Sequence, residues 1–433
     1  MDIVRALLDD VHGVTFIAYN LFLIPVTFFS FIYYMAALRG IFGREEKDEN
    51  NTYSQTNWPN VTIQIPTYNE PVAIRCAKSC LEFDYPKDRF EVLIGDDSRD
   101  AEVSRAIDVF AAESNGRVKV VRRENNMGFK AGNLNNMLKH SNGEILVIFD
   151  SDFVAPKDFL KKMVAPFTQD EKVACAQAEW DFLNLNTNHI STLSATLLMF
   201  YYSLIVPINR RLGVPFMFGS GEAVRKDVVL ELGGWNERSL TEDTDFSIRA
   251  LKSGYKIAYR SDVKVKGEVP YTLKGLMSQQ RRWAYGNTKV FMEHAKSIIF
   301  GPFTLLQKIM MTYTTSIGYL SNFLLLLFFI SGTIYFFSQP PAPIDLMKFI
   351  NQTSKLVLIT SGFIAGGVIA LLKKDKIGIL VPAMLTVVSM GMLVSYSVCI
   401  GFSKAVLGKE LLWSAINKEG NHTYISPQAA PEE

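Results

Sequence analysis

Two carboxylates one residue apart, Asp150 and Asp152, directly follow five consecutive apolar residues, 145–149. Such a run predicts a strand buried on both faces, and ligands of open α/β sheets bind at the edge where these strands end. The two acids can share Mg²⁺ or Mn²⁺, which usually also contacts substrate phosphates. The stretch therefore indicates a metal-nucleotide site, although roughly one Asp-x-Asp is expected by chance in a chain of this length.

Three further strands are predicted to stand beside this one. They and the first cover 61–65, 90–94, 118–122 and 144–149. Helical patterns lie between them, which indicates βαβ units and an α/β fold with a mainly parallel sheet. The polar residues after three of the strands, Thr67 to Glu70, Asp96 to Ser98 and Asp150 to Asp152, are then expected along one edge.

The apolar content points to a membrane. The chain has 433 residues, 48% of them hydrophobic, and a mean hydropathy of +0.12, which is high for a soluble protein. Four stretches without charge account for it: Val14 to Leu38, Ile309 to Ile344, Leu356 to Leu372 and Ile377 to Ser403. A span needs about 20 apolar residues, so four transmembrane helices are predicted, the first of them a retained anchor.

Charges beside these stretches predict an orientation. Arg39, Arg44 and Lys47 follow the first stretch, and 373–376 is a basic loop between the last two, so the central region is expected to be cytoplasmic. Four spans then place the tail on the opposite side, unless residues 298–337 hold an interfacial helix plus one span. Residues 193–212 also read as an interfacial helix.

Other classes are not indicated. A net charge of +2 without a basic, aromatic-rich stripe argues against a nucleic-acid partner. Cys76 and Cys80 have no partner pair at zinc spacing, so buried free thiols are predicted.

Several ordered motifs resemble the processive, cellulose-synthase-like members of glycosyltransferase family 2. They are Asp96-Asp97-Ser98, 128–135, Asp150-Ser151-Asp152, 218–221, Thr241-Glu242-Asp243 and the Q-x-x-R-W of 279–283. The resemblance covers roughly residues 60–300. It implies a Rossmann-like GT-A nucleotide-sugar-binding domain with transmembrane and interfacial helices. The implied reaction is inverting transfer from a UDP- or GDP-sugar to a growing β-linked glucan or mannan, and a non-processive enzyme making a glycolipid or polyprenyl-phosphate sugar is the alternative.

The resemblance also implies roles for individual residues. The nucleotide would be bound by Thr67, Tyr68, Glu70, Asp96, Asp97, Lys130, Asp150 and Arg282, and the acceptor by Phe218, Gly219, Ser220, Gly221, Gln279 and Trp283. Asp150 and Asp152 would hold Mg²⁺ or Mn²⁺. Asp243 would be the general base beside Glu242, a role that requires a carboxylate of raised pKa. Residues 413–420 loosely resemble the loop that covers the nucleotide in processive members.

Plainer interpretations stand beside these roles. Asp96 to Ser98 could be a helix-capping loop, Lys130 a solvated lysine and 218–221 a set of tight turns. Thr241 could cap a helix that begins with two acids, and 279–283 could lie on a membrane surface.

The expected organisation has four parts: an anchor and linker (1–55), a cytoplasmic catalytic domain (56–300), transmembrane helices (301–405) and a polar tail (406–433). The partners would be a nucleotide-sugar donor, a glycan or lipid acceptor and the lipid bilayer of the plasma membrane or an endomembrane.

Overall fold

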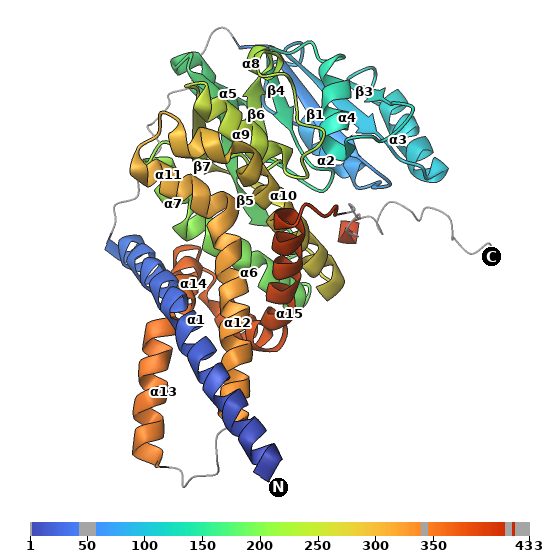
Figure 1. The fold of residues 1–433 in the computed structure, drawn as a ribbon. Coiled ribbons are helices and arrows are strands. Elements are labelled where there is room, and N and C mark those ends of the chain that lie inside the picture. The colour runs from blue at the N-terminus through green and yellow to red at the C-terminus, as the bar shows by residue number, and fades with distance from the viewer. Residues whose placement is uncertain (1, 43–57, 339–344, 412–417, 421–433) are drawn as a thin grey trace, which may run out of the picture.

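The computed structural model describes residues 2–42, 58–338, 345–411 and 418–420. An α/β domain forms one end of the molecule and long helices form the other, with the N-terminus at the far tip of the helical part (Figure 1). Most of the predicted linker, residues 413–417 and the end of the tail lie outside the described residues.

The α/β domain contains one seven-stranded sheet in the order β3-β2-β1-β4-β6-β5-β7. The strands are β1 (Val61–Thr67), β2 (Phe90–Asp96), β3 (Val118–Val121), β4 (Ile145–Ile148), β5 (Val173–Phe182), β6 (Glu222–Arg225) and β7 (Lys256–Gly267). The first four are parallel to one another, and β6 runs antiparallel to β4 and β5. The four predicted strands and the mainly parallel sheet are confirmed; β1 and β2 each extend two residues further.

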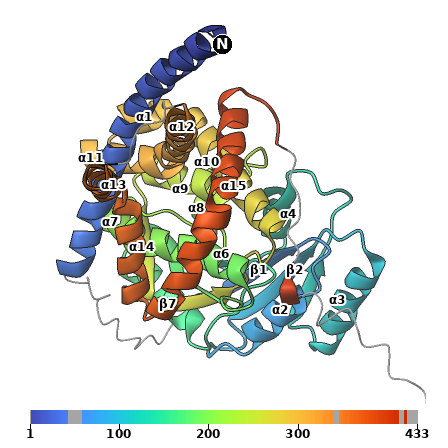
Figure 2. The same cartoon turned by 90° about the horizontal axis from the view of Figure 1, so that it is seen from below.

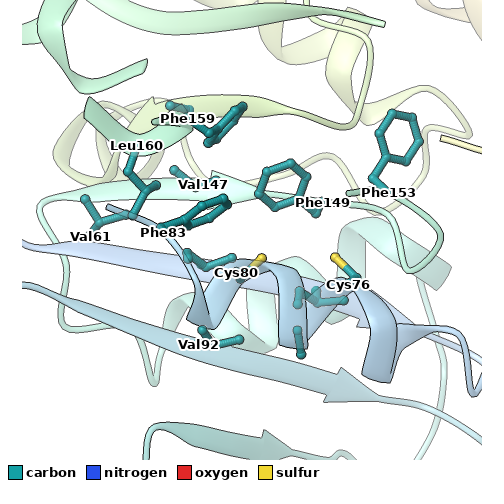
Figure 3. Close-up of a cluster of buried hydrophobic side chains, with 14 of the residues drawn as sticks. Val61, Cys76, Cys80, Phe83, Val92, Val147, Phe149, Phe153, Phe159 and Leu160 are labelled. Atoms are coloured by element: carbon teal, nitrogen blue, oxygen red, sulfur yellow. The ribbon is translucent and has the colours of Figure 1, made fainter. Parts of the chain in front are cut away.

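Strand β4 is buried on both faces, as its unbroken apolar sequence predicted. Val147 packs on one side of the sheet with Phe149, Phe83 and Phe159, while Leu146 and Ile148 pack on the other (Figure 3). Helices between the strands supply both layers: α2 (Ala73–Leu81), α3 (Ala101–Glu113), α4 (Phe129–Leu138), α5 (Phe159–Gln169), α8 (Lys226–Glu231) and α9 (Glu242–Lys252). Each large apolar side chain buried this way contributes about 1.5–3 kcal/mol to the free energy of unfolding, so the packing on both faces holds β4 in place.

All four cysteines lie in the described part of the chain and are free, buried thiols, as predicted. Cys76 and Cys80 face the core from α2 (Figure 3).

The helical part joins segments distant in sequence. Its elements are α1 (Asp2–Phe42), α6 (His189–Leu204), α7 (Val206–Arg211), α10 (Leu273–Phe300), α11 (Leu305–Thr312), the π-helix η1 (Tyr313–Ile317), α12 (Gly318–Phe337), α13 (Leu346–Thr360), α14 (Gly362–Lys373), the short 3₁₀ turn η2 (Ile377–Ile379) and α15 (Leu380–Val406). Four segments are long and apolar enough to cross a membrane: 10–39, 189–211, 305–337 and 389–406. A fifth, formed by α13 and α14, is bent by 59°.

The structure differs from two expectations about these helices. The predicted span Leu356 to Leu372 is broken at Ser361, where α13 ends and α14 begins. The tail was expected on the opposite side from the α/β domain, but Lys418 contacts Asp152 within that domain. The length of an uncharged stretch shows only that its residues are apolar. It does not show where a helix bends or whether the helix crosses the membrane. Helix α15 packs along α10 and α6 (Figure 2), so its apolar residues cover protein there.

Candidate active site

The polar ends of β1, β2 and β4 meet at one edge of the sheet. Thr67 is paired with Asp96 at the last position of both strands, and the Asp97 N–H donates to the Thr67 carbonyl at 3.0 Å. A pocket of about 130 Å³ opens there. It is lined by Pro66, Thr67, Tyr68, Glu70, Asp97, Asn126, Phe129, Lys130, Asn133, Asp150, Ser151, Asp152, Arg282 and Lys418. Seven of the eight residues expected to bind the nucleotide are thus brought together.

Asp96 is the exception. Its carboxylate is 2% exposed and accepts hydrogen bonds from Ser104 Oγ at 2.8 Å and from the Arg122 guanidinium. Asp96 therefore anchors the loop that follows β2 through these hydrogen bonds and does not line the pocket. Asp97 lines the pocket and is held by Arg123, whose Nε and Nη2 donate to the two carboxylate oxygens at 2.8 and 2.6 Å.

The two acids of Asp-Ser-Asp have different surroundings. Asp150 is partly exposed, and its Oδ1 lies 2.7 Å from Lys130 Nζ. Asp152 is fully buried: Oδ1 lies 2.7 Å from Lys418 Nζ, and Oδ2 accepts the Glu268 N–H at 2.7 Å. Asp150 is therefore the acid that a bound ion could reach from the pocket, while the charge of Asp152 is neutralised by Lys418.

Glu70 is a fourth carboxylate of the pocket, with Asp97, Asp150 and Asp152. It accepts a hydrogen bond from the Ser151 hydroxyl. Burial raises the pKa of Glu70 to about 7, and the charges of Asp152 and Asp150 add to the rise, while Lys418 opposes it. Sets of carboxylate oxygens suit Mg²⁺ and Mn²⁺, and the partly exposed Asp150 is accessible to such an ion, which would compete with Lys130 and Lys418 for the two acids of Asp-Ser-Asp. The residues present therefore fit a divalent cation.

Lys130 occupies the centre of the site. Its ammonium lies 2.7 Å from Asp150 Oδ1, 3.3 Å from Glu242 Oε1 and 2.5 Å from the Gly219 carbonyl oxygen, to which it donates. Burial alone would lower the pKa of Lys130, but the surrounding carboxylates, led by Asp150 and Glu242, hold it above its ordinary value. The interpretation of Lys130 as a solvated surface lysine is wrong.

Asp243 stands in the first turn of α9, which begins at Glu242. Its Oδ1 accepts the Thr244 N–H at 2.8 Å. Burial, followed by the charge of Glu242, raises the pKa of Asp243 to about 7, against the opposing charge of Lys130. A carboxyl group poised near neutrality is suited to general-base catalysis.

Thr241 does not cap α9, contrary to the plainer interpretation. Its hydroxyl is buried without a hydrogen-bond partner among the described residues. The side chain turns toward α10, where Gly286 leaves room: a Cβ added there would lie 2.7 Å from Thr241 Cγ2.

Gly219 lies close to both charged groups at the centre of the site, Lys130 and Asp243. Its φ is +84°, and an added Cβ would lie 3.1 Å from Lys130 Nζ and 3.3 Å from Asp243 Oδ2. The loop 218–221 is thus more than a set of turns, because its backbone approaches both the lysine and the acid so closely that a side chain at 219 would crowd them. Within the same loop, Ser220 Oγ accepts the Asp150 N–H at 3.0 Å.

Glu222 is a buried acid that sequence reasoning missed. It lies on β6 and accepts the Gly219 N–H at 2.9 Å. Burial raises the pKa of Glu222 well above its usual range, and the nearby charge of Asp243 adds to this. Its position directly after Gly-Ser-Gly was the available signal.

Aromatic side chains cover the side of the site that faces the helices. Phe218 packs against Trp180, Tyr201, Tyr202 and Tyr259. Trp283 packs at the edge of the same cluster, and Gln279 lies half-buried one turn earlier on α10. Tyr201, Tyr202 and Tyr319 all interact electrostatically with Asp243. The sequence showed the aromatic stretch 200–202 but not its proximity to the acid.

Lys418 is the second residue that sequence reasoning left unassigned. It is far along the chain, and the loose similarity of 413–420 to a covering loop was the only signal for it. In the structure the Glu419 N–H donates to Glu268 Oε2 at 2.6 Å, which seats this segment beside the pocket.

A separate group of possible metal ligands lies on the outer side of α9. Asp245, Glu293 and His294 place one ligand atom each within 4.8 Å of one another, beside a cavity of about 430 Å³. Asp245 already accepts from Arg249 at 2.7 Å, His294 at 2.8 Å and Asn236 at 3.2 Å. Burial acts to raise the pKa of Asp245, but these donors, led by His294, lower it overall. The carboxylate therefore has a structural role that needs no ion.

These features define a class of protein. It has an α/β domain with a pocket lined by both carboxylates and cations at the carboxyl edge of its sheet, and apolar helices are attached to that domain. The family model described as "Glycosyltransferase like family 2" matches residues 59–286, more than half of the chain. The chain therefore belongs to this glycosyltransferase family, which confirms the predicted family and its GT-A-like fold.

Curated relatives include glucomannan 4-beta-mannosyltransferase 2 of Arabidopsis thaliana, 29% identical over 58% of this chain and 48% of that protein. Another is the probable glucomannan 4-beta-mannosyltransferase 9 of Oryza sativa subsp. japonica, 31% identical over 58% of this chain and 49% of that protein. The chain thus spans about half the length of these relatives.

Among solved structures, a mannosyltransferase from Pyrobaculum calidifontis in complex with GDP-Man and Mn²⁺ is similar in fold. It is 20% identical, with a TM-score of 0.62 over 94% of this chain and 99% of that one.

Proposed function

We propose that this protein is a membrane-bound, metal-dependent, inverting glycosyltransferase that extends a β-linked polysaccharide of the mannan or glucan type from a nucleotide sugar. The observation that carries the proposal is the meeting of donor-side and acceptor-side groups around Gly219, where Lys130 and Asp243 flank the backbone. The names of the mannan-forming relatives and the GDP-Man complex of the archaeal structure favour a GDP-sugar, here GDP-mannose.

The pocket residues would hold the donor. Thr67, Tyr68, Glu70 and Asp97 line its nucleotide end, and Lys130 and Arg282 are the cations available to the diphosphate. Asp150 and Asp152 would hold Mn²⁺ or Mg²⁺, which when bound supplies positive charge where negative charge grows on the leaving group. Asp96 contributes by fixing the loop below Asp97.

Asp243 would take the proton of the attacking hydroxyl. Its pKa of about 7 leaves it about half ionised at neutral pH and largely ionised above it, yet basic enough to accept that proton. Lys130 lies close to Gly219, as Asp243 does, and also contacts Asp150, so the charged groups run from the proposed base toward the acids proposed to hold the metal. In the proposed reaction the acceptor hydroxyl attacks from the Asp243 side. Attack opposite the diphosphate inverts the anomeric centre, giving a β-linkage from an α-linked donor.

The acceptor would be a glycan. Phe218, Trp283 and Tyr201 offer aromatic faces and a hydroxyl near Asp243, which are groups suited to neutral sugars. The loop 218–221 and Gln279 complete this side. A polyprenyl phosphate, the acceptor in the alternative function, would call for cations here, whereas Lys130, Arg282 and Lys418 all line the donor pocket.

The proposed organisation is the one expected from the sequence. An anchor and linker (1–55) would precede a cytoplasmic catalytic domain (56–300), apolar helices (301–405) and a tail (406–433). Bilayer insertion is supported by four helices of sufficient length and apolarity, and the basic residues beside them favour a cytoplasmic catalytic domain in the plasma membrane or an endomembrane.

Turnover of labelled GDP- and UDP-sugars by protein purified in detergent, with Mn²⁺ or Mg²⁺ and with sizing of the product, tests the proposal. Long β-linked polymer is expected from GDP-mannose, and Asp243→Asn should reduce its formation about 100- to 10,000-fold. Transfer of a single sugar to extracted lipid would favour the alternative. No turnover with any donor, with or without metal, would refute the enzyme assignment.

A further inference from the structure

A row of hydrogen bonds joins Asp243 to the apolar helix α12. The Thr244 N–H donates to Asp243 Oδ1 at 2.8 Å, and Thr244 Oγ1 donates to Asn287 Oδ1, also at 2.8 Å. Asn287 Nδ2 then donates to the Tyr319 hydroxyl at 2.7 Å. The bonds cross from α9 through α10 to α12, so a carboxylate of the α/β domain is connected to the helical part by side chains.

Asn287 is the centre of this connection. It lies four residues after Trp283 on α10 and therefore on the same helix face. Its side-chain carbonyl accepts a hydrogen bond from α9 and its side-chain amide donates one to α12. Rotation of this side chain, or loss of either partner, would therefore break at least one hydrogen bond. Asn287 is half-buried, and loss of either hydrogen bond would leave a polar group with less than its full set of partners, which favours this one arrangement.

Tyr319 is positioned by the helices around it. It follows the π-helix η1, and π-turns within helices are frequent at functional sites. From η1, Thr314 Oγ1 accepts a hydrogen bond from Asn209 Nδ2 at 3.0 Å, and the Tyr313 hydroxyl bonds that of Tyr33 on α1 at 2.5 Å. The beginning of α12, and Tyr319 with it, is therefore fixed against α7 and α1.

A second set of hydrogen bonds holds the backbone of Asp243 in the first turn of α9. Ser247 Oγ donates to the Asp243 carbonyl at 2.7 Å and accepts the Met217 N–H at 2.9 Å. That connection stays within the α/β domain. Among the described residues, the Asn287 route ties the acid by hydrogen bonds to the helices that flank the proposed acceptor site.

We propose that Asn287 and Tyr319 are positioning residues for Asp243, which set its carboxylate relative to an acceptor hydroxyl held between the α/β domain and the apolar helices. The proposal rests on the proposed function, because it takes Asp243 as the general base. Displacement of such a group by about 1 Å costs on the order of 100-fold in rate.

A pH effect is expected as well. The Thr244 N–H stabilises the ionised form of Asp243, so a displaced Thr244 should raise the pKa of this carboxyl further. The other titratable groups that act on Asp243 are Glu242 on α9, Lys130 on α4, Asp150 after β4, Glu222 on β6, Tyr201 and Tyr202 on α6, and Tyr319. Substitutions at Asn287 and Thr244 leave all of these in place.

The experiment measures kcat, donor KM and the pH profile of polymer formation for Asn287→Ala, Tyr319→Phe and Thr244→Val in detergent. We expect kcat to fall about tenfold or more, donor KM to change less than twofold, and the acid limb of kcat to move to higher pH. Thr244→Ser keeps the hydroxyl and the N–H, so it should behave as wild type.

Tyr34→Phe is the matched control, because it also removes a hydroxyl bonded between apolar helices, to Ser361 Oγ at 2.7 Å and the Leu358 carbonyl. It should leave kcat and the pH profile unchanged. Wild-type kinetics in Asn287→Ala and Thr244→Val, or a raised donor KM with normal kcat, would overturn the positioning role alone. An inactive wild type would overturn the proposed function, and this inference with it.

Discussion

The ammonium nitrogen of Lys418 lies 2.7 Å from Oδ1 of the fully buried Asp152. Burial would lower the pKa of Lys418, but Asp152 and Glu70 hold it above its ordinary value, so the lysine stays charged. It therefore competes with any divalent cation for this carboxylate. Lys418→Ala should bind Mn²⁺ roughly tenfold more tightly without nucleotide, a change of about 1.4 kcal/mol.

Electron paramagnetic resonance of free Mn²⁺ measures this binding. Lys409→Ala, which removes an exposed lysine from the same segment, is the control and should bind as wild type. Weaker Mn²⁺ binding by Lys418→Ala would contradict competition, as would wild-type binding by Asp152→Asn.

Gly219→Ala should impair the chemical step. The new Cβ would approach both Lys130 Nζ and Asp243 Oδ2 and would be strained at a φ of +84°. We expect kcat to fall roughly 10- to 100-fold with metal binding intact. Gly233→Ala shares the strain, at a φ of +83°, but its Cβ meets nothing within 4 Å. Equal kinetic losses in both variants would attribute the effect to backbone strain.

Activity should fall as the pH drops below about 7. The base must be ionised to accept a proton, and burial raises the pKa of Asp243 to about 7, so each further unit of acidity removes about nine-tenths of the active form. Profiles of kcat from pH 5 to 9 measure this limb. Glu70 has a pKa of similar height, so Glu70→Gln is compared. If the acid limb disappears in that variant, Asp243 is not its source.

Asp245→Asn should destabilise the protein by about 3 kcal/mol, because the Arg249 and His294 partners lose their buried counter-charge. Glu293→Gln changes an exposed acid of the same group and should have little effect on the melting temperature. Stabilisation by added Zn²⁺ or Mn²⁺ that both substitutions abolish would show a metal site instead.

The parallel strands were predictable because each is a short apolar run that ends in a polar loop. Val61 at the start of β1 pairs in parallel with Phe90 of β2 and with Ile145 of β4, as this pattern predicts. Residues of the donor pocket were found for the same reason, since parallel strands bring their carboxyl ends to one edge.

Contacts between distant segments could not be predicted. Tyr319 carries no local pattern that places it beside Asp243, and the Gly-Ser-Gly before Glu222 marks a loop without showing which acid it approaches; tertiary packing places both residues. The bend at Ser361 lies inside an uncharged stretch, where hydropathy has no feature to mark it. The side on which the tail lies was predicted wrongly because it was derived from the number of uncharged stretches, and that number does not show how each stretch packs.

The seat of Lys418 on Asp152 also has a consequence for biosynthesis. The sheet residues of the pocket emerge from the ribosome long before Lys418, which follows α15. Until translation has passed that position, one wall of the pocket is missing. A nascent or prematurely terminated chain can thus fold its sheet while its donor site stays unfinished, and completion of the site is delayed until the apolar helices have been synthesised.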